Sequence, residues 1–69
     1  MERTAVSSSN IGAIGYEAET QTLEVEFLNG SIYQYAGVSV EEYEAMMNSD
    51  SKGKYLNTNI KGRYSFNKL

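Results

Sequence analysis

The strongest constraint on the fold of this chain lies in residues 23–35, which read LEVEFLNGSIYQY. Apolar and polar residues alternate on both sides of Asn29-Gly30, as they do in strands that bury one face. Asn-Gly favours a tight reversal, because both residues readily adopt left-handed backbone angles. The segment therefore predicts a β-hairpin.

Two registers are compatible with this turn, and a shift of one residue between them moves every side chain to the other face. A two-residue turn at Asn29-Gly30 would expose both tyrosine rings. A three-residue loop, 28–30, instead pairs Phe27 with Ser31 and uses Gly30 as a left-handed bulge residue. We favour this second register because it gathers five apolar side chains on one face: Leu23, Val25, Phe27, Tyr33 and Tyr35. The other face then holds Glu24, Glu26, Ile32 and Gln34, with the isoleucine exposed.

The segments on either side of the hairpin predict one more strand and a helix. Residues 11–16 are expected to form the first strand, whose two glycines indicate a bulge or a close backbone approach. Ser39 and Glu42 have the Ser-x-x-Glu spacing of a capping box, in which each side chain accepts a hydrogen bond from the other residue's amide. The helix that they begin carries an apolar stripe that should face the sheet: Val40, Tyr43, Met46 and Met47.

A second helix is expected over residues 51–61, with Tyr55, Leu56 and Ile60 on its inner side and Gly62 as its C-terminal stop. Residues 63–69 alternate, and either dock as a short extended segment or stay mobile. The whole chain, residues 1–69, is expected to be one α+β domain in which residues 1–7 form a flexible arm. Its fold is predicted to be a three-stranded antiparallel β-meander followed by two short α-helices packed on one face.

The composition of the chain excludes most catalytic chemistry. The 69 residues contain no histidine and no cysteine, so the usual general base, thiol nucleophile and zinc ligands are missing. Glu41, Glu42 and Glu44 cluster, but an acidic helix start more often complements the helix dipole. We therefore expect no enzyme, no cofactor and no metal site. No apolar run approaches the roughly 18 residues of a membrane span, so we expect a cytoplasmic protein with no membrane partner. We also expect it to be a monomer.

Charge is divided unevenly along the chain. Residues 1–50 contain all nine acidic residues and one basic residue, Arg3, whereas residues 51–69 contain five basic residues and no acidic one. The two parts therefore carry net charges of −8 and +5. Such a split can mark a contact with nucleic acid or another polyanion on the basic side. It is equally what a small protein needs for solubility and internal charge complementarity.

One motif in the basic part suggests a mechanism for binding anions: Ser51-Lys52-Gly53-Lys54-Tyr55 at the start of the second helix. Free amides there attract anions, and a hydroxyl, two ammonium groups and a glycine strengthen the attraction. The motif lacks the full spacing of a P-loop and its preceding strand. A capped helix start with solvated lysines is the alternative interpretation.

The candidate anion- or nucleic-acid-binding set comprises Ser51, Lys52, Lys54, Lys61, Arg63 and Tyr64. Tyr55, Tyr64 and Phe66 stand among basic residues and could stack on the bases of a single strand. Packing in the core is the alternative for these rings, most clearly for Tyr55.

Several motifs follow one another in a fixed order: Ser8-x-x-Ile11, Tyr16, Leu23-x-Val25-x-Phe27-x-x-Gly30, Tyr33-x-Tyr35, a short helix, Ser51-Lys52-Gly53-Lys54-Tyr55 and Arg63-Tyr64. This order resembles the KTSC domain family, named for its place at the C-terminus of some lysyl-tRNA synthetases. The family also occurs as free-standing small bacterial and phage proteins. The resemblance covers residues 7–69, and its Tyr-x-Tyr and Ser-Lys-Gly-Lys motifs are specific in combination. Ser39 stands where the family commonly has a proline.

The resemblance implies no established activity, although RNA binding is suggested for the family from its synthetase context. We expect a small non-catalytic binding module. The leading hypothesis is weak binding of single-stranded RNA or another polyanion through the basic C-terminal part. The alternative is a protein–protein interaction module that uses a sheet edge or the exposed sheet face at Ile32.

Overall fold

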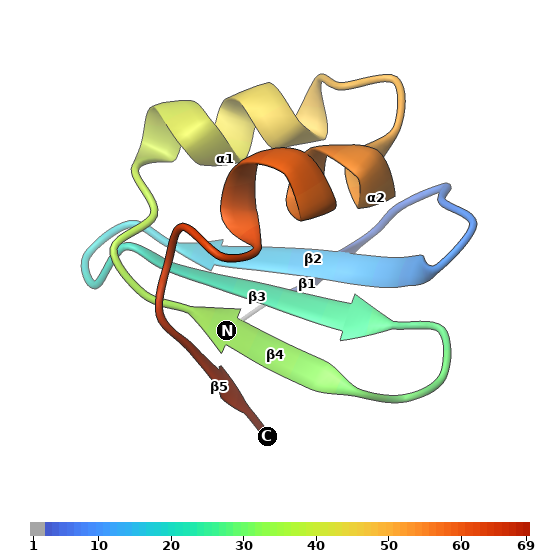
Figure 1. Cartoon of the computed structure of the whole chain (residues 1–69), viewed down its shortest axis with the longest axis horizontal. Coiled ribbons are helices and arrows are strands. Elements are labelled where there is room, and N and C mark those ends of the chain that lie inside the picture. The colour runs from blue at the N-terminus through green and yellow to red at the C-terminus, as the bar shows by residue number, and fades with distance from the viewer. Residues whose placement is uncertain (1–2) are drawn as a thin grey trace.

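The organising element of the protein is a five-stranded antiparallel sheet, in a computed structural model that describes residues 3–69. Its spatial order follows the chain: β1 (Arg3–Ala5), β2 (Ile11–Glu17), β3 (Thr22–Phe27), β4 (Ile32–Tyr35) and β5 (Phe66–Lys68). Between β4 and β5 lie α1 (Val40–Met47) and α2 (Lys52–Tyr55), which continues into the π-helical turn η1 (Leu56–Ile60). Both helical segments cover the same face of the sheet (Figure 1). The α+β class and the pair of helices on one face are therefore as predicted.

The β3–β4 hairpin has the bulged register. Val25 pairs with Tyr33, and the amide of Phe27 donates to the carbonyl of Ser31 across the loop at 2.8 Å. Gly30 has a φ of 93°, an angle that glycine adopts without the steric cost that a Cβ would bring. The predicted register is confirmed.

The first predicted strand is also confirmed, and it contains the bulge that its glycines indicated. Pairing between β2 and β3 shifts register between Ile11 and Ala13. Because of this extra residue, both Ile11 and Ile14 point into the core, where neither is exposed. The side chain of Tyr16, also in β2, extends toward α1 and stacks on Tyr43, with ring centroids 4.6 Å apart.

The core lies between the sheet and the helices and consists of Ile11, Ile14, Leu23, Val25, Tyr35, Val38, Met46, Leu56 and Ile60. Leu56 and Ile60 face inward as predicted, although the turn that carries them is π-helical. Gly62, with a φ of 86°, follows as the predicted stop. Val40 was predicted to face the sheet with the rest of the apolar stripe, but it is 40% exposed in the first turn of α1.

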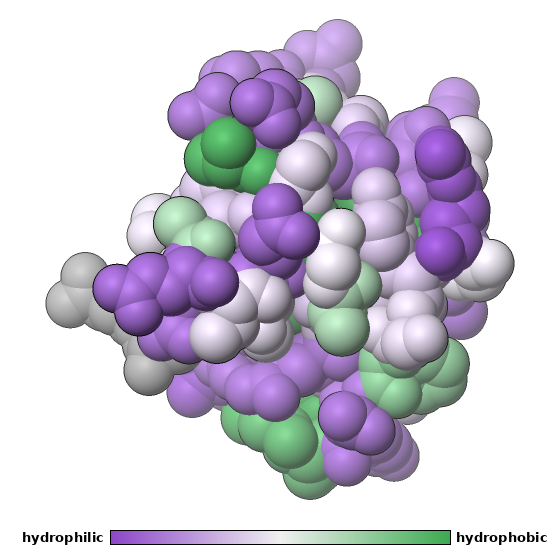
Figure 2. All heavy atoms as spheres, turned by 90° about the vertical axis from the view of Figure 1, so that its left-hand side faces the viewer, coloured by the Kyte–Doolittle hydropathy of each residue, from purple (hydrophilic) through white to green (hydrophobic). Residues whose placement is uncertain are grey.

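The exposed large apolar side chains within residues 3–69 are Leu28, Val40, Phe66 and Leu69. Figure 2 shows one side of the molecule, on which hydrophobic residues form small patches separated by hydrophilic ones. That face therefore offers no continuous apolar surface.

The prediction of three strands is wrong, because both ends of the chain add an edge strand. β1 pairs with β2, and β5 pairs with β4. A three-residue strand has no measurable alternation, so only tertiary contacts reveal it. Residues 63–69 thus dock through β5. The division at residue 7 between an arm and the domain stays a prediction: residues 3–5 form β1, and residues 1–2 lie outside the described part of the chain.

A charge cluster on the helix-free face holds β1 in place. Glu24 is only 6% exposed there, and its carboxylate accepts a hydrogen bond from Gln34 at 2.8 Å. The guanidinium of Arg3 lies 3.2 Å from the same carboxylate and 3.6 Å from that of Glu26. Ile32, on this face, is half-buried rather than exposed.

No helix within residues 3–69 is long and apolar enough to cross a membrane.

Candidate nucleic-acid interface

The six predicted binding residues do not share one hollow. Ser51 and Lys54 line a hollow of about 400 Å³ that also contains the carboxylate of Asp50. Lys61 lines a second hollow of about 410 Å³. The remaining three residues line neither hollow.

The start of α2 has the geometry of a capped helix. The Ser51 hydroxyl accepts a hydrogen bond from the amide of Lys54 at 3.3 Å, and the ammonium group of Lys52 donates to the carbonyl of Ser49 at 3.5 Å. Gly53 is buried, and a Cβ at this position would lie 2.6 Å from Oδ1 of Asn10. A phosphate therefore has no room beside this glycine. This geometry favours the alternative of a capped helix start, while anion binding by these lysines stays a prediction.

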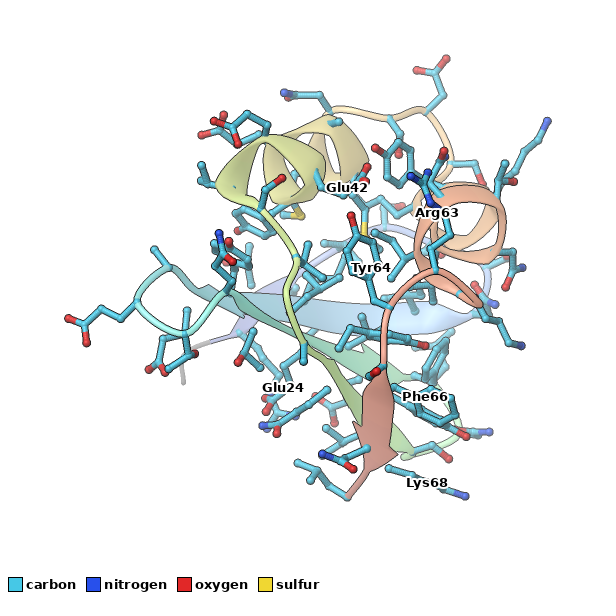
Figure 3. The ribbon with its side chains drawn as sticks, turned by 60° about the vertical axis from the view of Figure 1, so that its left-hand side comes forward. Glu24, Glu42, Arg63, Tyr64, Phe66 and Lys68 are labelled. Carbon is cyan, nitrogen blue, oxygen red and sulfur yellow. The ribbon has the colours of Figure 1, made fainter. Side chains whose placement is uncertain are left out.

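Tyr64 belongs to a contact between the two helical segments. Its hydroxyl donates to Glu42 Oε1 at 3.0 Å, and the hydroxyl of Tyr55 donates to the other oxygen of the same carboxylate. Figure 3 shows the Tyr64 ring pointing toward Glu42. We call Glu42, Tyr55 and Tyr64 the closed cluster. Both rings are half-buried and tethered, so neither is a free stacking group.

The closed cluster raises the pKa of both phenols. The hydrogen bond to Glu42 is the main cause for the pKa of Tyr55, followed by burial. Burial is the main cause of the raised pKa of Tyr64, followed by the same carboxylate, while Arg63 acts in the opposite direction.

Only one half of the predicted capping box forms. The Ser39 hydroxyl accepts a hydrogen bond from the Glu42 amide at 3.2 Å, but the Glu42 carboxylate bonds to the two phenols instead of to the amide of Ser39.

The second hollow, which we call the aromatic hollow, is lined by Asn10, Phe27, Asn29, Ser31, Tyr33, Tyr35, Leu56, Asn57, Lys61 and Phe66. These residues combine four aromatic rings with amide and hydroxyl groups and one lysine. Among residues 3–69, no acidic residue lines this hollow. It therefore suits a partly apolar ligand that carries negative charge.

Phe66 is the exposed ring of this hollow, with 55% of its surface accessible. Its centroid lies 5.5 Å from that of Tyr33 and 5.8 Å from that of Tyr35. Lys68 follows two residues later, with its ammonium group 6.0 Å from the Tyr33 ring centroid. In Figure 3, Phe66 and Lys68 project from the same side of β5. One side of the hollow thus pairs an apolar ring with a positive charge.

Sequence reasoning found only part of this hollow. It named Lys61 as a site residue and considered Phe66 as a stacking group, but it missed Tyr33 and the three asparagines. The lining residues come from four separate segments of the chain, so no local pattern unites them. The one local signal was the Phe66-x-Lys68 spacing, which places both side chains on one face of a strand.

The basic side chains of the C-terminal part form no ion pair with any other residue of the described range 3–69. Within residues 3–69, the ion pairs are those of Arg3 with Glu24 and Glu26. Lys54, Lys61, Arg63 and Lys68 are exposed. The described residues also contain no group of three or more His, Cys, Asp or Glu side chains that could hold a metal ion.

Comparison with known proteins agrees with the motif order. The model of the KTSC domain matches residues 7–64. The chain belongs to the KTSC family. A crystal structure of a KTSC domain protein from Yersinia pestis superposes with a TM-score of 0.93 at 38% sequence identity, covering 99% of this chain and 96% of that one.

KTSC relatives occur in two settings. An uncharacterized protein of Stutzerimonas stutzeri is 39% identical over 64 residues, which are 93% of this chain and 90% of that protein. A lysine–tRNA ligase of Nostoc punctiforme is 43% identical over 61 residues, which are 88% of this chain but 11% of the ligase. The resemblance drawn from the sequence is thereby confirmed, and the KTSC domain is found both almost alone and as a small part of a larger enzyme.

Proposed function

We propose that this KTSC domain is a non-catalytic module that binds single-stranded RNA weakly through its basic C-terminal part. The observation that carries the proposal is the lack of ion pairs there. Eight of the nine acidic residues lie within residues 3–69, and none of these eight lies within ion-pair distance of the lysines or the arginine of residues 51–69. These charges are consequently available to an external polyanion.

The relatives support RNA as the polyanion. Several are named lysine–tRNA ligases, and the KTSC sequence makes up about a tenth of each. The name of these enzymes points to RNA rather than to another polyanion as the ligand. The ligase activity itself belongs to those larger proteins.

The binding is expected to be weak and sensitive to salt. At most four or five basic groups can contact phosphates, and each contact on a single strand contributes about 0.7 to the slope of log affinity against log salt concentration. The slope should therefore not exceed roughly 3 in magnitude. The acidic first part of the chain repels any strand that extends beyond the basic surface.

Fluorescence anisotropy of a labelled single-stranded RNA, measured between about 20 and 150 mM salt, tests the proposal. The double variant Lys54→Glu/Lys61→Glu should abolish binding, because both lysines are exposed and the fold does not depend on them. Glu41→Gln, an exposed change in the acidic part, is the matched control and should bind at least as well as the parent. Absence of binding by the parent protein at about 20 mM salt would contradict the proposal.

The alternative function, contact with a protein through a sheet edge, has less structural support. The outer strands β1 and β5 have three residues each. Short edge strands are a usual protection against pairing with another chain. A protein partner therefore becomes the preferred hypothesis only if the RNA titration fails.

A further inference from the structure

We infer that the aromatic hollow receives unpaired nucleobases, which stack on Phe66 while Lys61 and Lys68 contact the flanking phosphates. This inference rests on the proposed function and deepens it, because it assigns recognition to the bases rather than to charge alone. It places the site between η1, the hairpin loop and β5, away from the start of α2. The occupant is a short unpaired strand.

The first step concerns the exposed ring. Phe66 is 55% exposed even though it belongs to a paired strand. Its ring is tilted by 39° to Tyr33 and by 41° to Tyr35, so it contacts both tyrosines while more than half of its surface stays accessible. A ring held in this way loses little conformational freedom when a base stacks on it. Aromatic side chains of this kind are the usual stacking platforms for single strands.

The second step concerns charge. Lys61 lines the hollow, and Lys68 projects from the same side of β5 as Phe66 (Figure 3). Neither lysine has an ion-pair partner within residues 3–69. The first hollow differs, because it includes Asp50, and the ring of Tyr55 beside it is tethered to Glu42. Charge complementarity therefore favours the aromatic hollow for a polyanion with planar bases.

The third step concerns the polar groups of the lining. Asn10, Asn29 and Asn57 supply amide groups around the rings. Oδ1 of Asn29 accepts a hydrogen bond from the amide of Ser31 at 2.9 Å, which leaves its amide nitrogen as a donor. Amide groups match the donors and acceptors on the edges of an unpaired base, whereas a paired base has its Watson–Crick edge occupied. We therefore expect single strands to bind more tightly than duplexes, and homopolymers of different bases to bind unequally.

The size of the hollow agrees with this ligand. A volume of about 410 Å³ lies near the lower end of the range for small-molecule pockets, roughly 300 to 1,000 Å³. It suits a short stretch of single strand rather than a helix of RNA or protein.

Anisotropy with three probes at about 20 mM salt tests the inference. The probes are a single-stranded RNA octamer, the same octamer in a duplex, and inorganic polyphosphate of similar charge, which has no bases. Phe66→Ala is expected to weaken binding of the single strand by about fivefold or more, the lower limit for losing one stacked base. It should leave the affinity for polyphosphate unchanged. Phe66→Tyr keeps the ring and should retain binding.

Tyr64→Phe is the matched control, because it alters an aromatic residue two positions away whose hydroxyl is bound to Glu42. Its affinity for the single strand should equal that of the parent. An unchanged affinity in Phe66→Ala, with RNA and polyphosphate both lost in Lys54→Glu/Lys61→Glu, would overturn the inference and leave the proposed function standing. A parent protein that binds neither RNA probe would overturn both.

Discussion

Tyr64 and Phe66 stand two residues apart in the same basic segment, yet the structure gives them opposite environments. Tyr64 turns into the closed cluster, where its hydroxyl bonds to Glu42 at 3.0 Å. Phe66 turns to the aromatic hollow, where 55% of its surface is accessible. The comparison shows that an aromatic residue among lysines becomes a candidate for ligand binding only when no internal partner occupies it.

The two regions also differ in how completely their polar groups are satisfied. In the closed cluster, one carboxylate accepts from two phenols, and the pKa values of both phenols are raised by this carboxylate and by burial. Lys61, which lines the aromatic hollow, and Lys68, which follows Phe66 on β5, have no ion-pair partner among residues 3–69. We therefore assign a structural role to the closed cluster and a binding role to the hollow.

The largest effect separates two tyrosines on the same face of β4, one buried and one partly accessible. Tyr35 is 3% exposed, so Tyr35→Ala should lower the free energy of unfolding by about 3 to 5 kcal/mol, as for other large buried aromatics. Tyr33 is half-buried beside the hollow, and Tyr33→Ala should cost about 1 to 2 kcal/mol while weakening RNA binding. Urea denaturation measures both losses. Equal losses in the two variants would show that the hollow is part of the core.

The next largest effect is expected when the hydrogen-bond acceptor of the closed cluster, Glu42, is removed. Glu42→Ala leaves two phenols without their carboxylate and should lower stability by about 1 to 3 kcal/mol. Glu41→Ala is the matched control, because Glu41 shares the first turn of α1 but is exposed. A similar loss in the control would mean that the helix dipole, rather than the cluster, explains the effect of Glu42.

A smaller effect is expected at the start of α1. Ser39 caps the helix by accepting from the Glu42 amide at 3.2 Å, so Ser39→Ala should cost about 0.5 to 2 kcal/mol. RNA affinity should not change, because Ser39 does not line the aromatic hollow. Ser9→Ala, in an exposed loop, serves as the control in the same thermal melts. An unchanged melting curve for Ser39→Ala would show that this cap does not stabilise the helix.

The smallest effect concerns alkaline pH. Because the folded pKa values of Tyr55 and Tyr64 are raised, the folded state holds these protons more tightly than the unfolded chain does. Their contribution to stability is fully present below the unfolded pKa of about 10 and is lost as the pH rises through the folded values. Stability should therefore fall above about pH 10, and less steeply in Tyr55→Phe/Tyr64→Phe. Urea denaturation between pH 7 and 11 would contradict this account if the two slopes were equal.

The sequence predicted the centre of the fold better than its ends. The register of the hairpin follows from local signals, since alternation and Asn-Gly lie within one segment. β1 and β5 were missed because each has three residues. β5 forms because Phe66 packs on Tyr33 and Tyr35, and β1 because Arg3 reaches Glu24, contacts that no short pattern reveals.

The candidate site was harder to predict than the fold for a related reason. Tyr64 and Phe66 have similar neighbours in sequence, and what separates them is a carboxylate 22 residues away from Tyr64. The amides of the hollow likewise come from the loop before β2, the hairpin and η1. The charge and aromatic content of residues 51–69 could predict the region of the candidate site, but not which of its aromatic rings is accessible to a ligand.

The most direct test of the difference between the two regions is a titration of ¹⁵N-labelled protein with single-stranded RNA at about 20 mM salt, where the Debye length exceeds roughly 20 Å. The account predicts chemical-shift changes in residues 29–33, 57–61 and 65–68, which surround the aromatic hollow. The resonances of α1, including Glu42, should stay in place. Changes confined to residues 51–55 or to α1, with the residues of the hollow unmoved, would contradict it.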